Sequence, residues 1–349
     1  MPLPLLPHIG ADMTNEYEID RATFRQGTTQ SITELHITGG QRAIERPGRL
    51  WSWYPVLSEG QVRNLAPRPI QQIAALANAV GLDLFGGDEQ SGLEGPLVSR
   101  IWTPLDGPHA GGLQPADLWR AIARNADGAG DIEYALLARH ISYSLTAAEI
   151  RLRDASDGYH AQLMAAIQSK TTNGCRFSNI PMRDLQLAFH SVLSELASTR
   201  DYLAASVALK LGAPAKIDAM NRFKEWVSAV SRGHLASGPV AAAMLAAYDS
   251  GSADPWLHQL TEYRNLYLHR VPLGSTTSAA PALLTYTIVE HAGTGFPRIT
   301  MPLDASDPSA PGQDALTRFL QLYRAMTRLV KLAADHAPYD TSMPVFVVR

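Results

Sequence analysis

Three residues near the centre of the second half of this chain have the types and the spacing for acid–base chemistry: Arg264, Asn265 and His269. Asn265 and His269 are four positions apart, so on a helix they lie one turn apart on the same face. The carboxamide can then hold one imidazole nitrogen and leave the other free to move a proton. A guanidinium beside this pair can offset charge on a phosphate. The three residues therefore fit transesterification of RNA.

This chemistry needs no metal ion, and we expect no cofactor. The sequence has no H-E-x-x-H motif, its histidines are scattered, and Cys175 is its single cysteine. Cysteine-based zinc or iron–sulfur sites and an internal disulfide are therefore excluded. Arg270, which directly follows the histidine, is a further candidate for binding phosphate.

Two other arginine–histidine pairs have a similar spacing. Arg153 precedes His160, but Gly158 lies between them and makes a continuous helix doubtful. Arg183 and His190 are seven positions apart on one helix face, where a surface ion pair or a place at the edge of the core is the better interpretation. The residues around position 265 also have structural alternatives. The histidine can be stabilised by a helix C-terminus, and the arginine by an ion pair with Glu262 or Asp201.

Composition indicates a globular protein of ordinary kind. The chain has 349 residues, a length sufficient for two structural units. Of these residues 46% are hydrophobic and 18% charged, as in ordinary globular proteins. Its net charge of −3 argues against a protein that coats nucleic acid by bulk electrostatics. The excess of arginine over lysine suits phosphate binding, but codon bias is the simpler explanation, so arginine content alone decides nothing. No apolar run has the length of a membrane span, and the N-terminus lacks signal-peptide features. We expect a cytoplasmic protein without a membrane partner.

The apolar pattern divides the chain into three regions. Residues 1–125 form a mixed region of unknown role, with strands at 33–38 and 97–103, a helix at 69–80, and loops at glycines such as Gly86 and Gly87. Residues 126–175 form a connecting helical segment with a possible break at Gly158. Residues 176–349 form a helical domain. Its expected elements are helices at 182–211, 217–231, 239–248, 255–270 and 314–336, a β-hairpin at 283–303 and a closing strand at 345–349.

The string Glu-Tyr-Arg-Asn-Leu-Tyr-Leu-His-Arg at residues 262–270 resembles the R-x4–6-H motif of HEPN ribonuclease domains. Residues 189–204 resemble the first helix of these domains, with Glu195 and Asp201 as the matching acidic residues in a supporting role. The resemblance covers roughly residues 180–340. It implies a mainly α fold, namely an antiparallel helical bundle with a β-hairpin insertion, preceded by the mixed α/β N-terminal region.

The resemblance also implies a function. HEPN enzymes of this type are metal-independent endoribonucleases, often toxins or defence effectors, that leave a 2′,3′-cyclic phosphate and a 5′-hydroxyl. They act as homodimers in which two motif helices meet. Arg264, Asn265 and His269 of both copies would then build one composite cleft for RNA. A protein regulator or trigger is a further expected partner.

A hypothesis of another class is a non-catalytic helical scaffold for dimerisation or nucleotide binding, whose N-terminal half binds a partner. RNA cleavage that resists a chelator and depends on His269 separates the two hypotheses.

Overall fold

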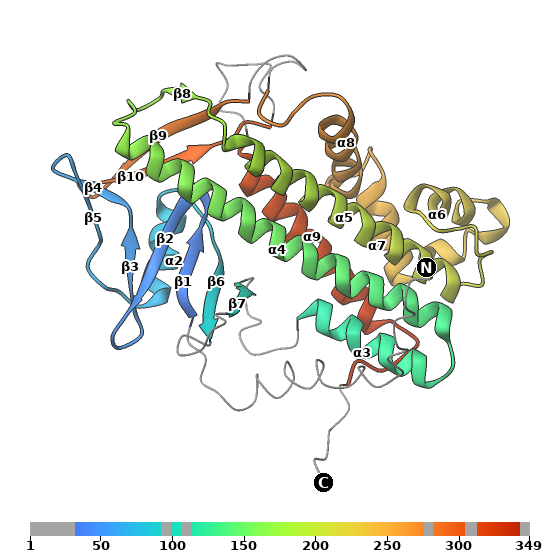
Figure 1. Ribbon diagram of the computed structural model, residues 1–349. Helices are drawn as coiled ribbons and strands as arrows, with labels where there is room; N and C mark the ends of the chain where they lie inside the picture. The colour runs from blue at the N-terminus through green and yellow to red at the C-terminus, as the bar shows by residue number, and fades with distance from the viewer. Residues whose placement is uncertain (1–31, 92–98, 106–113, 276–281, 304–312, 343–349) are drawn as a thin grey trace, which may run out of the picture.

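The computed structural model describes residues 32–91, 99–105, 114–275, 282–303 and 313–342. Two antiparallel five-stranded sheets lie at one end of the molecule (Figure 1). Sheet A has the strand order β3-β2-β1-β6-β7, and sheet B has the order β5-β4-β10-β9-β8. Their strands are β1 (Ile32–Ile37), β2 (Gln41–Arg46), β3 (Leu50–Tyr54), β4 (Val56–Ser58), β5 (Gln61–Arg63), β6 (Leu84–Ser91), β7 (Ser99–Pro104), β8 (Arg176–Phe177), β9 (Leu284–His291) and β10 (Thr294–Thr300).

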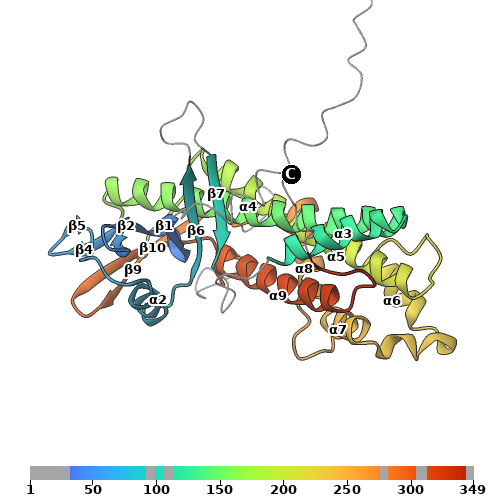
Figure 2. The same cartoon turned by 90° about the horizontal axis from the view of Figure 1, so that it is seen from below.

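Helices make up the rest of the molecule. The two longest, α4 and α5, lie side by side along its length, and α9 packs behind them (Figures 1 and 2). In the part of the chain that is described, no helix combines the length and the hydropathy needed to cross a bilayer. The helices are α2 (Ile70–Ala79), α3 (Pro115–Gly128), α4 (Ile132–Gln168), α5 (Met182–Lys210), α6 (Met220–Val227), α7 (Pro239–Tyr248), α8 (Trp256–His269) and α9 (Ala315–Asp335).

Helix α4 belongs to both parts of the fold. Its first half packs among the helices, and its second half lies over the sheets (Figure 2). The Asp131 side chain caps its start by accepting from the Tyr134 amide at 3.1 Å. The helix continues through Gly158, so the predicted break there is wrong. A Cβ added at Gly158 would lie 3.1 Å from Leu185 Cδ1, so the glycine allows close packing of α4 against α5.

Two hydrophobic cores stabilise this arrangement. The larger core runs through the helices and reaches the inner strands of sheet B, and the smaller one lies between sheet A and α2. A buried carboxylate joins the helices to sheet B: Asp314 caps α9 through the Thr317 amide (3.0 Å). It also accepts from the Tyr159 hydroxyl of α4 (2.7 Å) and from the Met301 amide (3.0 Å). One residue thus fixes where α4, α9 and the end of β10 meet.

The predicted fold class is wrong. The chain is an α/β protein with two sheets, and it is not a mainly α bundle with a small hairpin. The hairpin predicted at 283–303 exists as β9 and β10, but these strands lie within sheet B. There β10 pairs with β4 and β9 pairs with β8. Strands β4 and β5, from the N-terminal region, therefore complete a sheet with strands from the last quarter of the chain.

Other local predictions are confirmed where the chain is described. The strand at 33–38 is β1, the helix at 69–80 is α2, and the long helices at 182–211 and 314–336 are α5 and α9. The loop predicted at Gly86 and Gly87 is wrong, because both residues lie in β6. The closing strand expected at residues 345–349 lies outside the described residues.

Gly86 is required by close packing. A Cβ there would lie 2.0 Å from Cζ2 of Trp102, because the indole of this β7 residue covers the glycine. The same indole contacts the buried ring of His36, with centroids 4.6 Å apart. Trp102 can therefore close over His36 only because β6 has no side chain at position 86.

We predict that Gly86→Ala destabilises the protein by about 1–3 kcal/mol, because the added methyl group displaces the indole. Urea unfolding monitored by tryptophan fluorescence measures this change. Gly128→Ala is the matched control, since its Cβ meets nothing within 4 Å and lies in a helix, where alanine is favoured. Equal stability of the two variants would contradict the packing argument.

Candidate functional site

Helix α8 holds the three residues that the sequence singled out. Leu257, Leu260 and Tyr267 form its buried side, and the Tyr267 hydroxyl donates to the backbone oxygen of Leu303. The opposite side is exposed. This hydrogen bond and the burial of Tyr267 fix how α8 is rotated about its axis, so its opposite side faces solvent.

Asn265 and His269 are both exposed and lie one turn apart on the outer side of α8. Arg270 is exposed at the helix end, where it is the C-cap residue. Arg264 is half-buried and lies about 140° around the helix axis from His269. In the described part of the chain, the side chains of these four residues make no hydrogen bond or ion pair with one another. The structure therefore brings Asn265 and His269 together on one strip and places Arg264 at its side.

The strip continues towards the start of α8. His258 and Glu262 are one turn apart, with Nε2 and Oε1 separated by 3.3 Å. Successive spacings of four, three and four residues keep His258, Glu262, Asn265 and His269 along one line of the helix surface. We call these four residues the α8 strip.

Asp201 has a different partner from the one expected. Its carboxylate accepts two hydrogen bonds from its neighbour Arg200, both at 2.9 Å, and Oδ1 also accepts from the Met220 amide at the start of α6 (3.1 Å). Arg200 in turn donates to the Thr261 hydroxyl of α8 at 2.6 Å. Asp201 thus supports the site indirectly, by joining α5, α6 and α8.

Glu195 lies about 140° around α5 from Arg200, which donates to Thr261 of α8. His190 was set aside from the sequence, yet it lies one turn from Gln186, which donates to the Leu273 carbonyl just beyond α8 (2.8 Å). Nε2 of His190 is buried and has no hydrogen-bond partner in the described structure, and burial lowers the pKa of this histidine. No sequence pattern distinguished it from an ordinary residue at the edge of the core.

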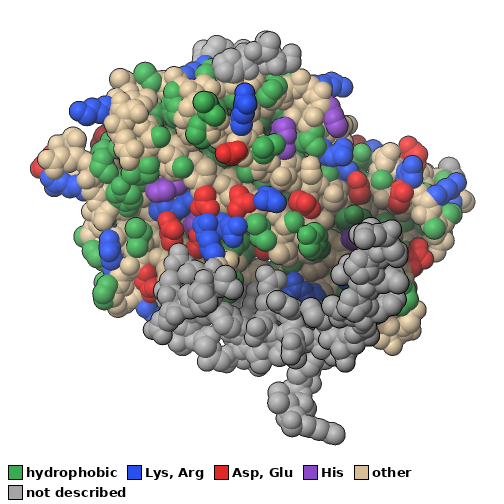
Figure 3. All heavy atoms as spheres, in the orientation of Figure 1, with side chains coloured by type: hydrophobic (Ala, Val, Ile, Leu, Met, Phe, Trp, Pro, Cys, Tyr) green, Lys and Arg blue, Asp and Glu red, His purple; other side chains and the backbone are tan. Residues whose placement is uncertain are grey.

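A second cluster of titratable side chains escaped the sequence analysis. It lies where α4 crosses sheet A, and on this face of the molecule side chains of both charges gather (Figure 3). His36 of β1 is fully buried between Ser156 of α4 (Nδ1 to Oγ, 3.1 Å) and Asp88 of β6 (Nε2 to Oδ2, 2.9 Å). Serine, histidine and aspartate are thus joined in the order used for nucleophilic catalysis.

The protonation of this cluster follows from its charges. Burial raises the pKa of Asp88, but hydrogen bonds from His36 and Arg100 outweigh this effect and the net shift is downwards. Burial lowers the pKa of His36 to about 4, with the Arg42 charge acting in the same direction. At neutral pH the imidazole is therefore neutral and donates from Nε2 to the Asp88 carboxylate. Nδ1 then accepts from the Ser156 hydroxyl.

Two arginines, Arg42 and Arg100, form ion pairs with the carboxylates around His36. Arg42, only 2% exposed, donates to Ser156 Oγ (2.9 Å) and pairs with Asp157 (3.0 Å) and Glu34 (3.3 Å). Arg100 pairs with Asp88 and Asp157. Side-chain oxygens of Glu34 and Asp88 and a ring nitrogen of His36 lie within 4.8 Å of one another, a spacing suited to a metal ion. Arg42 and Arg100 already pair with the carboxylates of Glu34 and Asp88, so a cation would compete with both guanidinium groups for the same oxygens.

Access decides what this cluster does. Ser156 and His36 are 0% exposed, and the Arg100–Asp157 ion pair is the partly exposed part of the cluster. No substrate atom can reach the Ser156 hydroxyl in this conformation. The cluster therefore acts as a buried polar connection between sheet A and α4, whereas Asn265 and His269 of the α8 strip are exposed.

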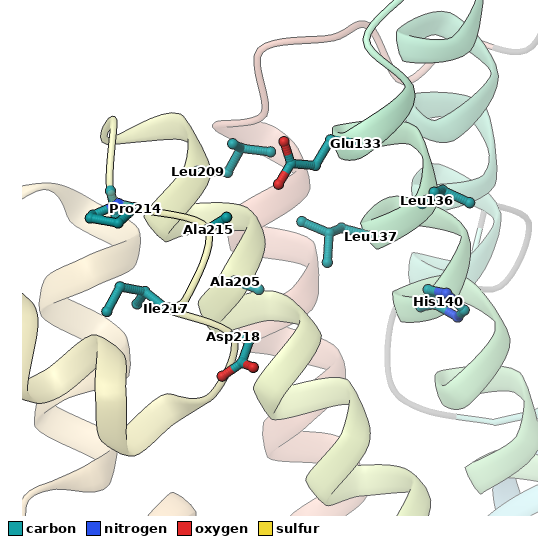
Figure 4. A pocket seen from close by; sticks show the side chains of 11 residues that line it. Glu133, Leu136, Leu137, His140, Ala205, Leu209, Pro214, Ala215, Ile217 and Asp218 are labelled. Carbon is teal, nitrogen blue, oxygen red and sulfur yellow. The ribbon is translucent and has the colours of Figure 1, made fainter.

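A pocket of about 270 Å³ lies between the start of α4 and the end of α5 (Figure 4). In the close-up, Leu137 and Glu133 of α4 point towards Leu209 of α5, and residues 213–218 close one side. The pocket lies roughly 30 Å along α5 from Gln186, which marks the C-terminal end of α8. It is therefore separate from Asn265 and His269.

Comparison of the chain with protein-family models, with curated proteins and with solved structures finds no match.

The buried histidine predicts a pH dependence of stability. Between about pH 6.5 and 4 the unfolded chain binds a proton at His36 that the folded chain does not bind, so the free energy of unfolding falls as the pH drops. We predict that His36→Gln, which keeps a donor and an acceptor, removes about 3 kcal/mol of this loss. Urea unfolding between pH 7 and 4 measures it. His291→Gln, at an exposed position, should keep the wild-type slope, and a His36→Gln slope equal to it would contradict the prediction.

Proposed function

We propose that this protein is a metal-independent endoribonuclease and that the α8 strip holds its acid–base residues. The observation that supports the proposal is the exposure of Asn265 and His269, one helical turn apart, at the end of α8. Among the acid–base clusters discussed, this one combines an imidazole with a steering amide in a place that a polymer can reach. The resemblance of residues 262–270 to the HEPN motif supports the same activity.

The reaction would proceed by internal transesterification. An imidazole takes the proton of the 2′-hydroxyl, and the 2′-oxygen attacks phosphorus. The bond to the 5′-oxygen breaks, and a protonated imidazole delivers a proton to that oxygen. The products are a 2′,3′-cyclic phosphate and a 5′-hydroxyl, with no change in oxidation state. Arg264 and Arg270, which flank the strip, would offset the negative charge that grows on the phosphorane.

This reaction needs one base and one acid, whereas the end of the strip offers a single histidine, His269. A homodimer with two α8 helices facing each other would supply the second imidazole and a second pair of arginines. The exposed position of Asn265 and His269 leaves them available for such pairing. With the enzyme we propose a cytoplasmic location, supported by the single cysteine, and a role as a toxin or defence effector under the control of a protein regulator or trigger.

The alternative of a non-catalytic scaffold is not favoured by a specific contact. The pocket between α4 and α5 is the feature on which it would rest. Two acidic residues, Glu133 and Asp218, and one histidine, His140, line that pocket, and the acidic pair disfavours an anionic phosphate.

We predict that purified protein cleaves single-stranded RNA in EDTA and leaves cyclic phosphate ends. His269→Ala should lower the rate about 10²- to 10⁴-fold, because general acid–base catalysis contributes that much. Asn265→Ala should have a smaller effect and should alter the pH–rate profile, since the amide only orients the imidazole. Gel analysis of end-labelled RNA gives the rates.

His336→Ala is the control, because this exposed histidine lies at the end of α9. Cleavage that is abolished by EDTA, or that survives in His269→Ala at the wild-type rate, would refute the proposed function.

A further inference from the structure

Basic residues concentrate in one short segment of this slightly acidic chain. Residues 210–234 carry five lysines and arginines against two acidic residues, a local charge of +3 in a chain of net charge −3. Three of the five lysines of the whole protein lie here, namely Lys210, Lys216 and Lys224. This charge lies on and around α6, beyond α5 and next to α7 (Figure 1).

The segment contains a groove with an aromatic wall. The groove has a volume of about 520 Å³ and is lined by Lys216, Ile217, Arg222, Glu225 and Trp226. Arg222 is oriented by hydrogen bonds to the Lys216 carbonyl (3.2 Å) and to Asp218 (2.8 Å). Trp226 is partly exposed. Cationic groups and a flat ring thus lie within one concave surface, a combination that suits phosphate and base of a single strand.

Cations and aromatic rings are interleaved at this end of the molecule. The guanidinium of Arg232 lies 5.0 Å from the ring centroid of Trp226, and Nζ of Lys224 lies 5.6 Å from that of Tyr248. Among the described residues these are the two cation–π pairs. Trp226 lines the groove, whereas Lys224 lies about 160° around α6 from it and faces Tyr248 of α7. Since every base has a π face, a ring such as that of Trp226 stacks on single strands with little dependence on sequence.

Helix α6 is linked to α8 by way of α7 and α5. The ring of Tyr248 lies 6.3 Å from that of His258, the first residue of the strip. His258 is roughly 16 Å from His269 along the helix axis. The bonds from Met220 to Asp201 and from Arg200 to Thr261 hold α6 at a fixed place relative to α8.

We propose that the α6 groove, lined by Lys216, Arg222 and Trp226, binds the single-stranded RNA on which the α8 strip acts. This inference rests on the proposed function for the fate of the RNA. Binding of RNA to the groove can be tested separately from cleavage, because binding does not require His269. It also explains how an acidic protein can hold a polyanion: the contact is local, and Trp226 adds stacking to the phosphate contacts.

The test uses a fluorescent twelve-nucleotide 2′-O-methyl RNA, which the wild-type protein can bind but cannot transesterify. Binding is measured by anisotropy in EDTA over a range of salt concentrations. We predict that Lys216→Gln lowers the affinity about three-fold or more at low salt. The slope of log affinity against log salt should decrease by about 0.7, since each phosphate contact contributes about that much for single strands.

Trp226→Leu should also weaken binding about ten-fold, but with an unchanged salt slope, because stacking releases no counterions. The control is Arg49→Gln, which removes the same charge from an exposed position at the far end of the molecule. Melting temperatures of all variants verify folding, and the lysine variant tests the groove even if the tryptophan variant is unstable.

Equal affinity of the lysine variant and the wild type, or an equal loss in the control, overturns the inference. The two proposals fail in different ways. If the wild-type protein binds through the groove and does not cleave unmodified RNA, the groove stands and the nuclease falls. If it cleaves RNA while the groove variants bind and cleave normally, the nuclease stands and the groove falls.

Discussion

The structure depends on one buried charge, the guanidinium of Arg42. A charge at 2% exposure costs several kcal/mol in free energy unless nearby groups satisfy it. Its partners come from three places: Glu34 from β1, the backbone carbonyl of Gln41 in β2, and Ser156 with Asp157 from α4. They surround the guanidinium only when sheet A lies against the second half of α4. The cost of burying Arg42 therefore specifies how the sheets and the helices are placed against each other.

The helices could be predicted from sequence because their information is local. In α5 and α9 the apolar residues return every three or four positions, and Asp314 precedes α9 as a capping residue. The β9–β10 hairpin was visible for a similar reason, since two short β-rich runs flank Ala292 and Gly293, which have a positive φ. In each case neighbouring residues favour the observed element without help from the rest of the chain.

The two sheets could not be predicted because the residues that stabilise them are distant in sequence. Gly86 has the pattern of a loop residue until Trp102 is placed over it, and Asp88 has that of a solvated carboxylate until His36 and Arg100 surround it. Strand β4 has three residues, too few for an alternating pattern, and its partner β10 lies more than two hundred positions later. A resemblance carried by helix motifs contains no information about such pairings, which is why it led to a mainly α bundle with only a hairpin insertion.

The two histidine sites separate the two requirements of acid–base catalysis. His36 has an ordered hydroxyl, an ordered carboxylate and a defined tautomer, but it is fully buried and no substrate can reach it. His269 has the opposite condition: it is accessible, and its neighbour Asn265 makes no side-chain contact in the described structure that would fix its orientation. The His36 site is thus fully preorganised but inaccessible to substrate, whereas the His269 site is accessible but not preorganised. In the isolated chain this face of α8 is exposed to solvent, and no described residue there fixes the orientation of His269. For the α8 strip to be catalytic, a second copy of the chain or the RNA itself must bind to this face and orient the imidazole.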